Sequence, residues 1–113
     1  MINAHWLDIG PVDQLPPLGA RTLPVLGGEQ IAIFRTANGD VHALVDKCPH
    51  KHGPLSQGIV HDTTVTCPLH NWRISLITGE ALGEDKGCTR VIPVRVDAGR
   101  VLICRSSALA AAA

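Results

Sequence analysis

Short runs of apolar and β-branched residues, separated by turn residues, recur along this chain and indicate extended strands. The run Glu29–Thr36 is the clearest example, because its odd-numbered and even-numbered side chains would project from opposite faces of an extended strand. No segment keeps a 3.6-residue apolar period over several turns, so we expect no long helix. Many short strands separated by turn residues predict an all-β fold of antiparallel strands, built as a sandwich or a barrel.

Turn-forming residues divide the chain into short extended runs. We expect strands over His5–Ile9, Arg21–Leu26, Glu29–Thr36, Val41–Asp46, Ile59–Val60, Thr63–Thr66, Trp72–Leu76, Arg90–Asp97 and Arg100–Arg105. Three dipeptides have the composition of two-residue β-hairpin loops: Gly27-Gly28, Asn38-Gly39 and Ala98-Gly99. Gly10-Pro11 should end the first strand, and Val12–Leu15 should form a single helical turn.

The order of these runs also predicts how the chain is organised. Residues 1–105 should form one domain, and residues 106–113 form a low-complexity tail rich in alanine. Residues 47–77 resemble an insertion between the strands of a base, because two loops there each project from the end of a small hairpin. That geometry can bring both loops to one point.

Composition and charge narrow the classes of function. The chain has 113 residues, of which 45% are hydrophobic and 3% aromatic, so its single core must be aliphatic. Ten Lys and Arg residues balance ten Asp and Glu residues, which leaves no basic field to bind nucleic acid or an anionic membrane. The longest apolar stretches fall short of the ~20 residues of a membrane span, and the N-terminus lacks a signal-peptide pattern. We therefore expect a cytoplasmic protein with reduced thiols.

Two short runs carry the candidate chemistry. They are Cys48-Pro49-His50 and Cys67-Pro68-Leu69-His70, and each offers one thiolate and one imidazole from a tight loop. A proline follows each cysteine and stiffens the chain at the expected point of ligation. Two Cys on one iron and two His on the other are the ligands of a Rieske [2Fe–2S] centre. The sequence therefore predicts such a cluster, held by Cys48, His50, Cys67 and His70.

A structural zinc site with two Cys and two His is the main alternative for these four residues. Zinc fingers usually place their two Cys on one element and their two His on another, whereas each loop here carries one of each. This mixed arrangement favours the two-iron centre. Disulfide bonds are disfavoured both by the expected compartment and by the pairing of two cysteines with histidine.

The remaining cysteines and histidines have ordinary explanations or none. Cys104 lies in the apolar run Val101–Cys104 and is expected to be a small core residue. Cys88 follows a glycine in a polar loop, and the sequence assigns it no role. His5, His42 and His61 are expected to be surface or hydrogen-bonded core residues.

Cys48–Gly58 and Cys67–Trp72 resemble the ligand loops of Rieske-type ferredoxin domains. Through Leu76–Ala81, Cys88, Arg90 and Pro93–Val96 the chain is similar to the small subunit of assimilatory NAD(P)H-dependent nitrite reductase, and the likeness runs from about Trp6 to Arg105. The resemblance implies an antiparallel β-sandwich base with a small inserted cluster-binding subdomain. It also implies a large partner subunit that carries flavin and sirohaem and reduces nitrite to ammonium in nitrate assimilation.

On this interpretation the chain itself only carries electrons. It has no nucleotide-binding glycine fingerprint, so catalysis would occur on the partner. The expected docking residues surround the ligands: His52, Pro54, Asn71 and Trp72. A stand-alone Rieske ferredoxin that supplies a ring-hydroxylating dioxygenase is the alternative, and a non-redox structural subunit is a third possibility.

Overall fold

The computed structural model describes residues 6–24, 30–47, 54–68, 71–83 and 86–104. Within these ranges the chain forms short strands and two single-turn 3-10 helices, η1 Val12–Gln14 and η2 Leu55–Gln57. The strands are β1 Trp6–Pro11, β2 Ala20–Pro24, β3 Gln30–Arg35, β4 Val41–Val45, β5 Ile59–His61, β6 Thr64–Thr66, β7 Arg73–Ser75, β8 Val91–Ile92, β9 Val94–Asp97 and β10 Arg100–Cys104. No helix in the described ranges has the length and apolar character needed to cross a membrane.

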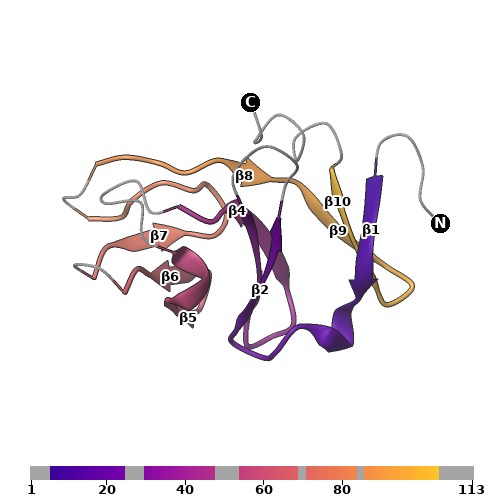
Figure 1. Ribbon diagram of the computed structural model, residues 1–113. Helices are drawn as coiled ribbons and strands as arrows, with labels where there is room; N and C mark the ends of the chain where they lie inside the picture. The colour runs from indigo at the N-terminus through magenta and orange to yellow at the C-terminus, as the bar shows by residue number, and fades with distance from the viewer. Residues whose placement is uncertain (1–5, 25–29, 48–53, 69–70, 84–85, 105–113) are drawn as a thin grey trace.

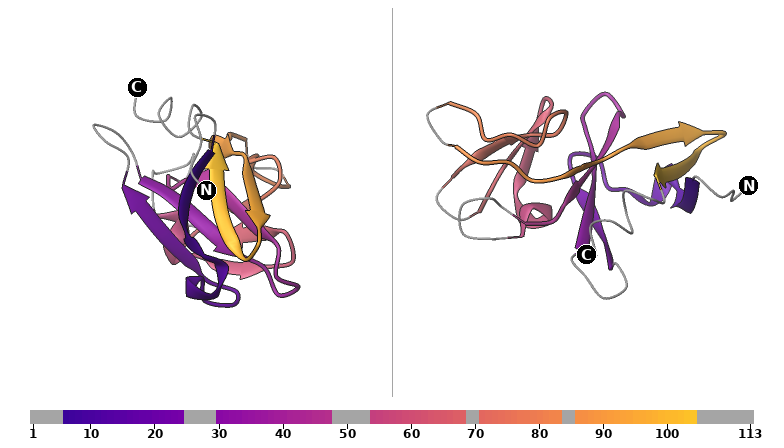
Figure 2. Two further views of the ribbon diagram at one scale, coloured as in Figure 1. Left: turned by 90° about the vertical axis from the view of Figure 1, so that its right-hand side faces the viewer. Right: turned by 90° about the horizontal axis from the view of Figure 1, so that it is seen from above.

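The described strands make three antiparallel sheets, which confirms the predicted all-β class. Their strand orders are β1-β10-β9, β2-β3-β4-β8 and β5-β6-β7. The four-stranded sheet lies in the middle, with the β1-β10-β9 sheet on one side and the β5-β6-β7 sheet on the other (Figure 1). The view from above shows the same order of three parts along the molecule (Figure 2).

Strand β3 supplies buried residues to both faces of the middle sheet. Ala32 and Phe34 belong to a core cluster shared with the β5-β6-β7 sheet, which we call the insert core. Ile31 and Ile33 belong to a second cluster shared with Val101 of the β1-β10-β9 sheet, which we call the base core. All four β3 side chains are fully buried. The predicted division of these side chains between opposite faces of the strand is therefore confirmed, and the β3 side chains on both faces are apolar and buried.

Two of the three predicted hairpin turns are confirmed. The Thr36 N–H donates to the Asp40 carbonyl over 2.9 Å, which closes the β3–β4 turn around Asn38-Gly39. Ala98 and Gly99 have φ values of +50° and +77° between β9 and β10, as a two-residue hairpin of the primed type requires. Gly27-Gly28 lies outside the described residues, although β2 and β3 pair as antiparallel neighbours on either side of it.

The prediction of one strand over Arg90–Asp97 is wrong. Strand β8 pairs with β4 in the middle sheet, whereas β9 pairs with β10 in the neighbouring sheet. Pro93 stands between them, and proline has no N–H to donate to a ladder. The chain therefore leaves one sheet and joins the other at this residue.

The first strand continues beyond the turn residues that were expected to end it. Strand β1 runs to Pro11, and its register against β10 shifts between Asp8 and Gly10, where Gly10 has a φ of +123°. The pair Gly10-Pro11 thus forms part of a bulged strand. A salt bridge of 3.1 Å between Arg100 and Asp8 joins the same two strands.

Gly79 follows β7 in a position that only glycine fits. Its φ is +76°, and a Cβ there would lie 2.2 Å from the carbonyl oxygen of Thr89. Gly99 has nearly the same φ of +77° but has open space around it. The two glycines therefore share backbone strain and differ in the clash.

We expect Gly79→Ala to destabilise the protein more than Gly99→Ala. The positive φ should cost each variant about 1–2 kcal/mol, and the clash with Thr89 should add about 1–3 kcal/mol to Gly79→Ala alone. Urea unfolding of both variants measures the difference. Equal losses of stability would contradict the steric explanation.

His42 on β4 is partly buried, and its Nε2 has no hydrogen-bond partner among the described residues. Burial lowers the pKa of His42 from its ordinary value of 6.5, and the Asp40 carboxylate only partly offsets this. Below the ordinary pKa the unfolded chain therefore binds a proton more readily than the folded chain. The contribution of neutral His42 to stability is complete above about pH 6.5 and decreases as the pH falls through the lowered value.

His42→Gln should accordingly weaken the loss of stability between about pH 7.5 and about pH 5.5. His61→Gln is the matched control, because His61 is exposed. Free energies of urea unfolding at the two pH values test this for the three proteins. A pH dependence in His42→Gln as steep as in the unaltered chain would refute the assignment.

Candidate metal centre

Of the four predicted ligands, Cys67 lies within the described part of the chain. The other three, Cys48, His50 and His70, lie outside it, as does the predicted docking residue His52. The structure describes the residues at which both ligand loops begin and end. These roots show how the fold can bring the loops together.

Cys67 stands at the head of the second loop, directly after β6. Its side chain is fully buried in the insert core. Its N–H donates to the Trp72 carbonyl over 2.7 Å, one step beyond the last paired residues of β6 and β7, Thr66 and Arg73. The second Cys-His run is thus the loop of a closed hairpin.

Asn71, which follows the expected ligand His70, has a left-handed backbone with a φ of +59°. Asparagine adopts this conformation more readily than most residues other than glycine. The residue type at this position is consistent with the reversal of chain direction between Cys67 and Trp72. The asparagine at position 71 is therefore a sequence signal for this turn.

The first loop leaves the middle sheet after β4 and returns to the fold at η2. Leu55, the first residue of η2, is fully buried in the insert core together with Cys67. Each loop therefore has one end in the insert core, although their cysteines are 19 positions apart in the sequence. This shared root supports the predicted convergence of the two runs.

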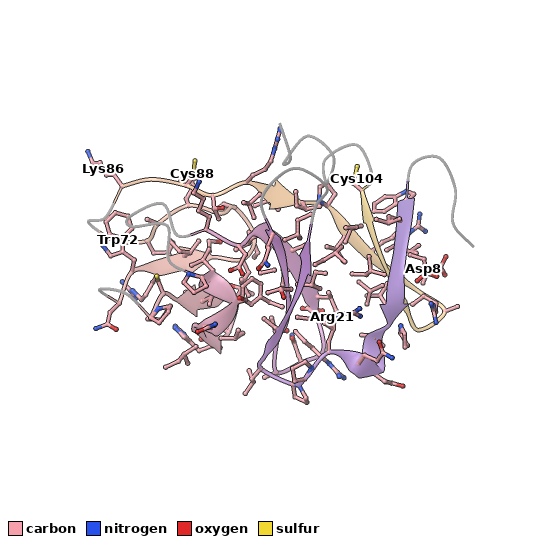
Figure 3. The ribbon with its side chains drawn as sticks, in the orientation of Figure 1. Asp8, Arg21, Trp72, Lys86, Cys88 and Cys104 are labelled. Carbon is pink, nitrogen blue, oxygen red and sulfur yellow. The ribbon has the colours of Figure 1, made fainter. Side chains whose placement is uncertain are left out.

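The predicted docking residues that the structure describes differ in exposure. Pro54 and Asn71 are exposed, whereas Trp72 is half-buried and packs against the insert core. Figure 3 shows Trp72 and Lys86 toward one end of the molecule and Asp8 toward the other. Trp72 therefore has a structural role in addition to any role in docking.

The other cysteines and histidines in the described ranges differ in their exposure and contacts. His61 is exposed, with its Nε2 3.0 Å from the Thr66 hydroxyl. Cys88 is exposed in the segment before β8, and Cys104 is only partly buried at the end of β10. The prediction that Cys104 belongs to the core is therefore only partly correct, because Cys104 is the last residue of β10 and lies at the end of the sheet. His5 lies outside the described residues.

The donor set fits a Rieske cluster. Cys67 supplies a buried thiol at a fixed hairpin end, and the sequence supplies one more Cys and two His from loops with the same root. Such a cluster, when bound, accepts and donates single electrons. The described part of the site supplies a buried apolar base, and burial of this kind is one of the factors that set the potential.

Solved structures of similar chains include two candidate nitrite reductase small subunits. The NADH-dependent one from Mycobacterium tuberculosis is 29% identical, covers 91% of this chain and 97% of its own, and superposes with a TM-score of 0.79. An NADPH-type one is 31% identical, covers 87% and 96% of the two chains, and has a TM-score of 0.76.

Sequence relatives include oxygenase components. The ferredoxin subunit of anthranilate 1,2-dioxygenase from Burkholderia cepacia is 34% identical over 99 residues, which are 87% of this chain and 90% of the relative. The 4beta-methylsterol monooxygenase of Methylococcus capsulatus (strain ATCC 33009 / NCIMB 11132 / Bath) is 36% identical over 73 residues, and the match spans only 17% of that protein. The chain thus corresponds to a whole ferredoxin but to a small part of the monooxygenase.

The Rieske [2Fe-2S] domain family matches residues 5–93, a range that contains both Cys-His runs and every strand from β1 to β8. The predicted fold and cofactor are therefore confirmed at the level of the family. This chain belongs to the Rieske [2Fe-2S] domain family and is a Rieske-type electron carrier.

Proposed function

We propose that this chain is the electron-transfer small subunit of a cytoplasmic NAD(P)H-dependent nitrite reductase, which reduces nitrite to ammonium. Cys48 and Cys67 hold one iron of its cluster, and His50 and His70 hold the other. The observation that carries the ligand assignment is the common root of the two loops. Leu55 follows the first run, and Cys67 begins the second. Both residues lie in the insert core, so each run has one end at this cluster.

The assignment to nitrite reductase depends on residues beyond the ligands. Leu76–Ala81 and Pro93–Val96 extend the resemblance to the small subunits of this enzyme. The two solved candidate small subunits correspond to this chain over nearly their whole length. This correspondence in fold and extent supports the proposal of a small subunit.

The reaction itself belongs to the large partner. The sequence contains no nucleotide-binding glycine fingerprint, so the nicotinamide, flavin and sirohaem steps occur on the other subunit. His52, Pro54, Asn71 and Trp72 form the docking face around the ligands, and Pro54 and Asn71 are exposed as docking requires. The isolated chain should carry electrons without reducing nitrite.

A second function has its own support. The anthranilate dioxygenase ferredoxin from Burkholderia cepacia is 34% identical and of nearly the same extent, which favours a ferredoxin that supplies an oxygenase. Both functions use the same cluster and the same ligands. They differ in the protein that receives the electron.

Cys67→Ala should abolish binding of the cluster, because a [2Fe–2S] centre needs its thiolate ligands. Iron analysis and electron paramagnetic resonance of the reduced protein provide the measurement. Cys88→Ala is the matched control, since Cys88 is exposed and should be dispensable. A full iron content in Cys67→Ala would refute the ligand set, and zinc in place of iron in the unaltered chain would support the alternative metal site.

The choice between the two functions requires the partner. A tagged chain recovered from its native host should bring down a protein that contains flavin and sirohaem. The recovered complex should reduce nitrite with NADH or NADPH, and removal of this chain should lower the rate at least tenfold if it lies on the electron path. Recovery of an oxygenase with non-haem iron would instead establish the ferredoxin function.

A further inference from the structure

We propose that Asp46 and Ser56 form a hydrogen-bonded clasp that positions the first cluster loop. The Ser56 N–H donates to Asp46 Oδ1 over 2.7 Å, and the Ser56 hydroxyl donates to Asp46 Oδ2 over 2.6 Å. Both carboxylate oxygens are thus bound by one residue, ten positions further along the chain. Bonds to an ionised carboxylate are roughly twice as strong as neutral ones.

The clasp joins the two ends of the loop that carries the first Cys-His run. Cys48 and His50 lie between Asp46 and Ser56 in the sequence. A bond that holds the two ends together removes much of the conformational freedom of the segment between them. This inference rests on the proposed ligands Cys48 and His50, and it is independent of the identity of the electron acceptor.

Among the described residues, strand pairing closes the second loop but not the first. The second loop joins two paired strands, β6 and β7, and the backbone bond from Cys67 to Trp72 completes that pairing. The first loop instead joins β4 of the middle sheet to η2, which is not a strand. A side-chain contact from Asp46 to Ser56 here takes the place of the backbone contact that closes the second loop.

The Asp46 end of the clasp is fixed to the middle sheet. The Asp46 N–H donates to the Gln30 carbonyl over 2.8 Å, and the Val45 N–H donates to the Arg90 carbonyl over 2.9 Å. The Val45 carbonyl accepts a further hydrogen bond of 2.9 Å from the hydroxyl of Thr89, which is buried. The residues just before Lys47 and Cys48 are thus held from both sides.

The Ser56 end is fixed to the insert core. Leu55, its neighbour in η2, is fully buried beside Cys67 in that cluster. The Gly58 N–H donates to the Leu55 carbonyl over 2.9 Å and closes the helical turn around Ser56. The clasp therefore ties the start of the first loop to the same core that holds the head of the second.

The consequence for the cluster is positional. Four ligands from two loops hold two irons only if the loops keep their relative place, and small displacements weaken a preorganised site. Asp46 and Ser56 are therefore positioning residues, because they act on the metal through Cys48 and His50. Their loss should accelerate release of the cluster and broaden its electron paramagnetic resonance signal.

Four variants test the clasp in the cluster-loaded full chain: Ser56→Ala, Asp46→Ala, the double variant and Ser56→Thr. The cluster's visible absorbance is followed in the presence of an iron chelator. We expect roughly tenfold faster loss in Ser56→Ala, as the removal of one hydrogen bond to a charged group suggests. Asp46→Ala should lose the cluster at least as fast, and the double variant no faster than Asp46→Ala. Ser56→Thr should restore the rate and the narrow signal, because it keeps the hydroxyl.

Ser75→Ala is the matched control. The Ser75 hydroxyl accepts hydrogen bonds of 3.1 Å from the N–H groups of Ile77 and Thr78, in the turn that follows β7. It is the same substitution in the same part of the fold, at the end of β7 away from Cys67, and it should leave cluster loss within about twofold of the unaltered chain.

The clasp would be overturned if Ser56→Ala and Asp46→Ala lost the cluster no faster than Ser75→Ala and showed the same line width. Additive effects of the two substitutions would overturn it as well. If Cys67→Ala still abolishes the cluster, the ligand proposal survives that failure. If Cys67→Ala retains the cluster, the ligand proposal fails by itself, whatever the clasp variants do.

Discussion

The rest of this structure depends on a middle sheet that must be covered on both faces. Alternate side chains of β3 are fully buried on opposite sides, so neither face of that strand can be left to water without a large loss of apolar burial. One face packs against the sheet built from the two ends of the chain, and the other packs against β5, β6 and β7. The β5-β6-β7 sheet is therefore one of the two covers of the middle sheet, and the core beneath it also contains the proposed ligand Cys67. Phe34 of the middle sheet and Cys67 lie in the same insert core, so the packing of the middle sheet affects the position of Cys67.

Specific residues fix the chain where it passes from the middle sheet to its two covers. Val45 and Asp46 form hydrogen bonds with β3, with η2 and with the segment before β8, so the chain is held firmly where it leaves the middle sheet for the first loop. At Pro93 the chain leaves the middle sheet and enters the β1-β10-β9 sheet. An electron carrier would benefit from firmly held loop ends, because a preorganised site limits the rearrangement that accompanies a change of charge.

The local sequence pattern was enough to predict many of the strands and turns. The contacts between residues far apart in the sequence could not be predicted from it. The division of the β3 side chains between two faces, the turns at Asn38-Gly39 and Ala98-Gly99, and the single turn at η1 follow from residue type and spacing, and the structure confirms them. The division of Arg90–Asp97 at Pro93 was missed because it depends on which sheet each half joins. The Asp46–Ser56 contact was missed because nothing in either residue type identifies its partner. The ligands could be proposed from two short runs, whereas the electron acceptor could not be decided, since a fold does not fix its partner.

The pairing of β1 with β10 has a consequence for how the protein is made. Residues 6–11 must wait for residues 100–104 before their ladder can form. The hairpins of β5, β6 and β7 need only contacts within residues 59–75, so their contact order is far lower. During synthesis strand β1 remains without its partner until residues 100–104 have left the ribosome. The ladders of β5, β6 and β7, beside the proposed ligand Cys67, can therefore form before the ladder of β1 and β10.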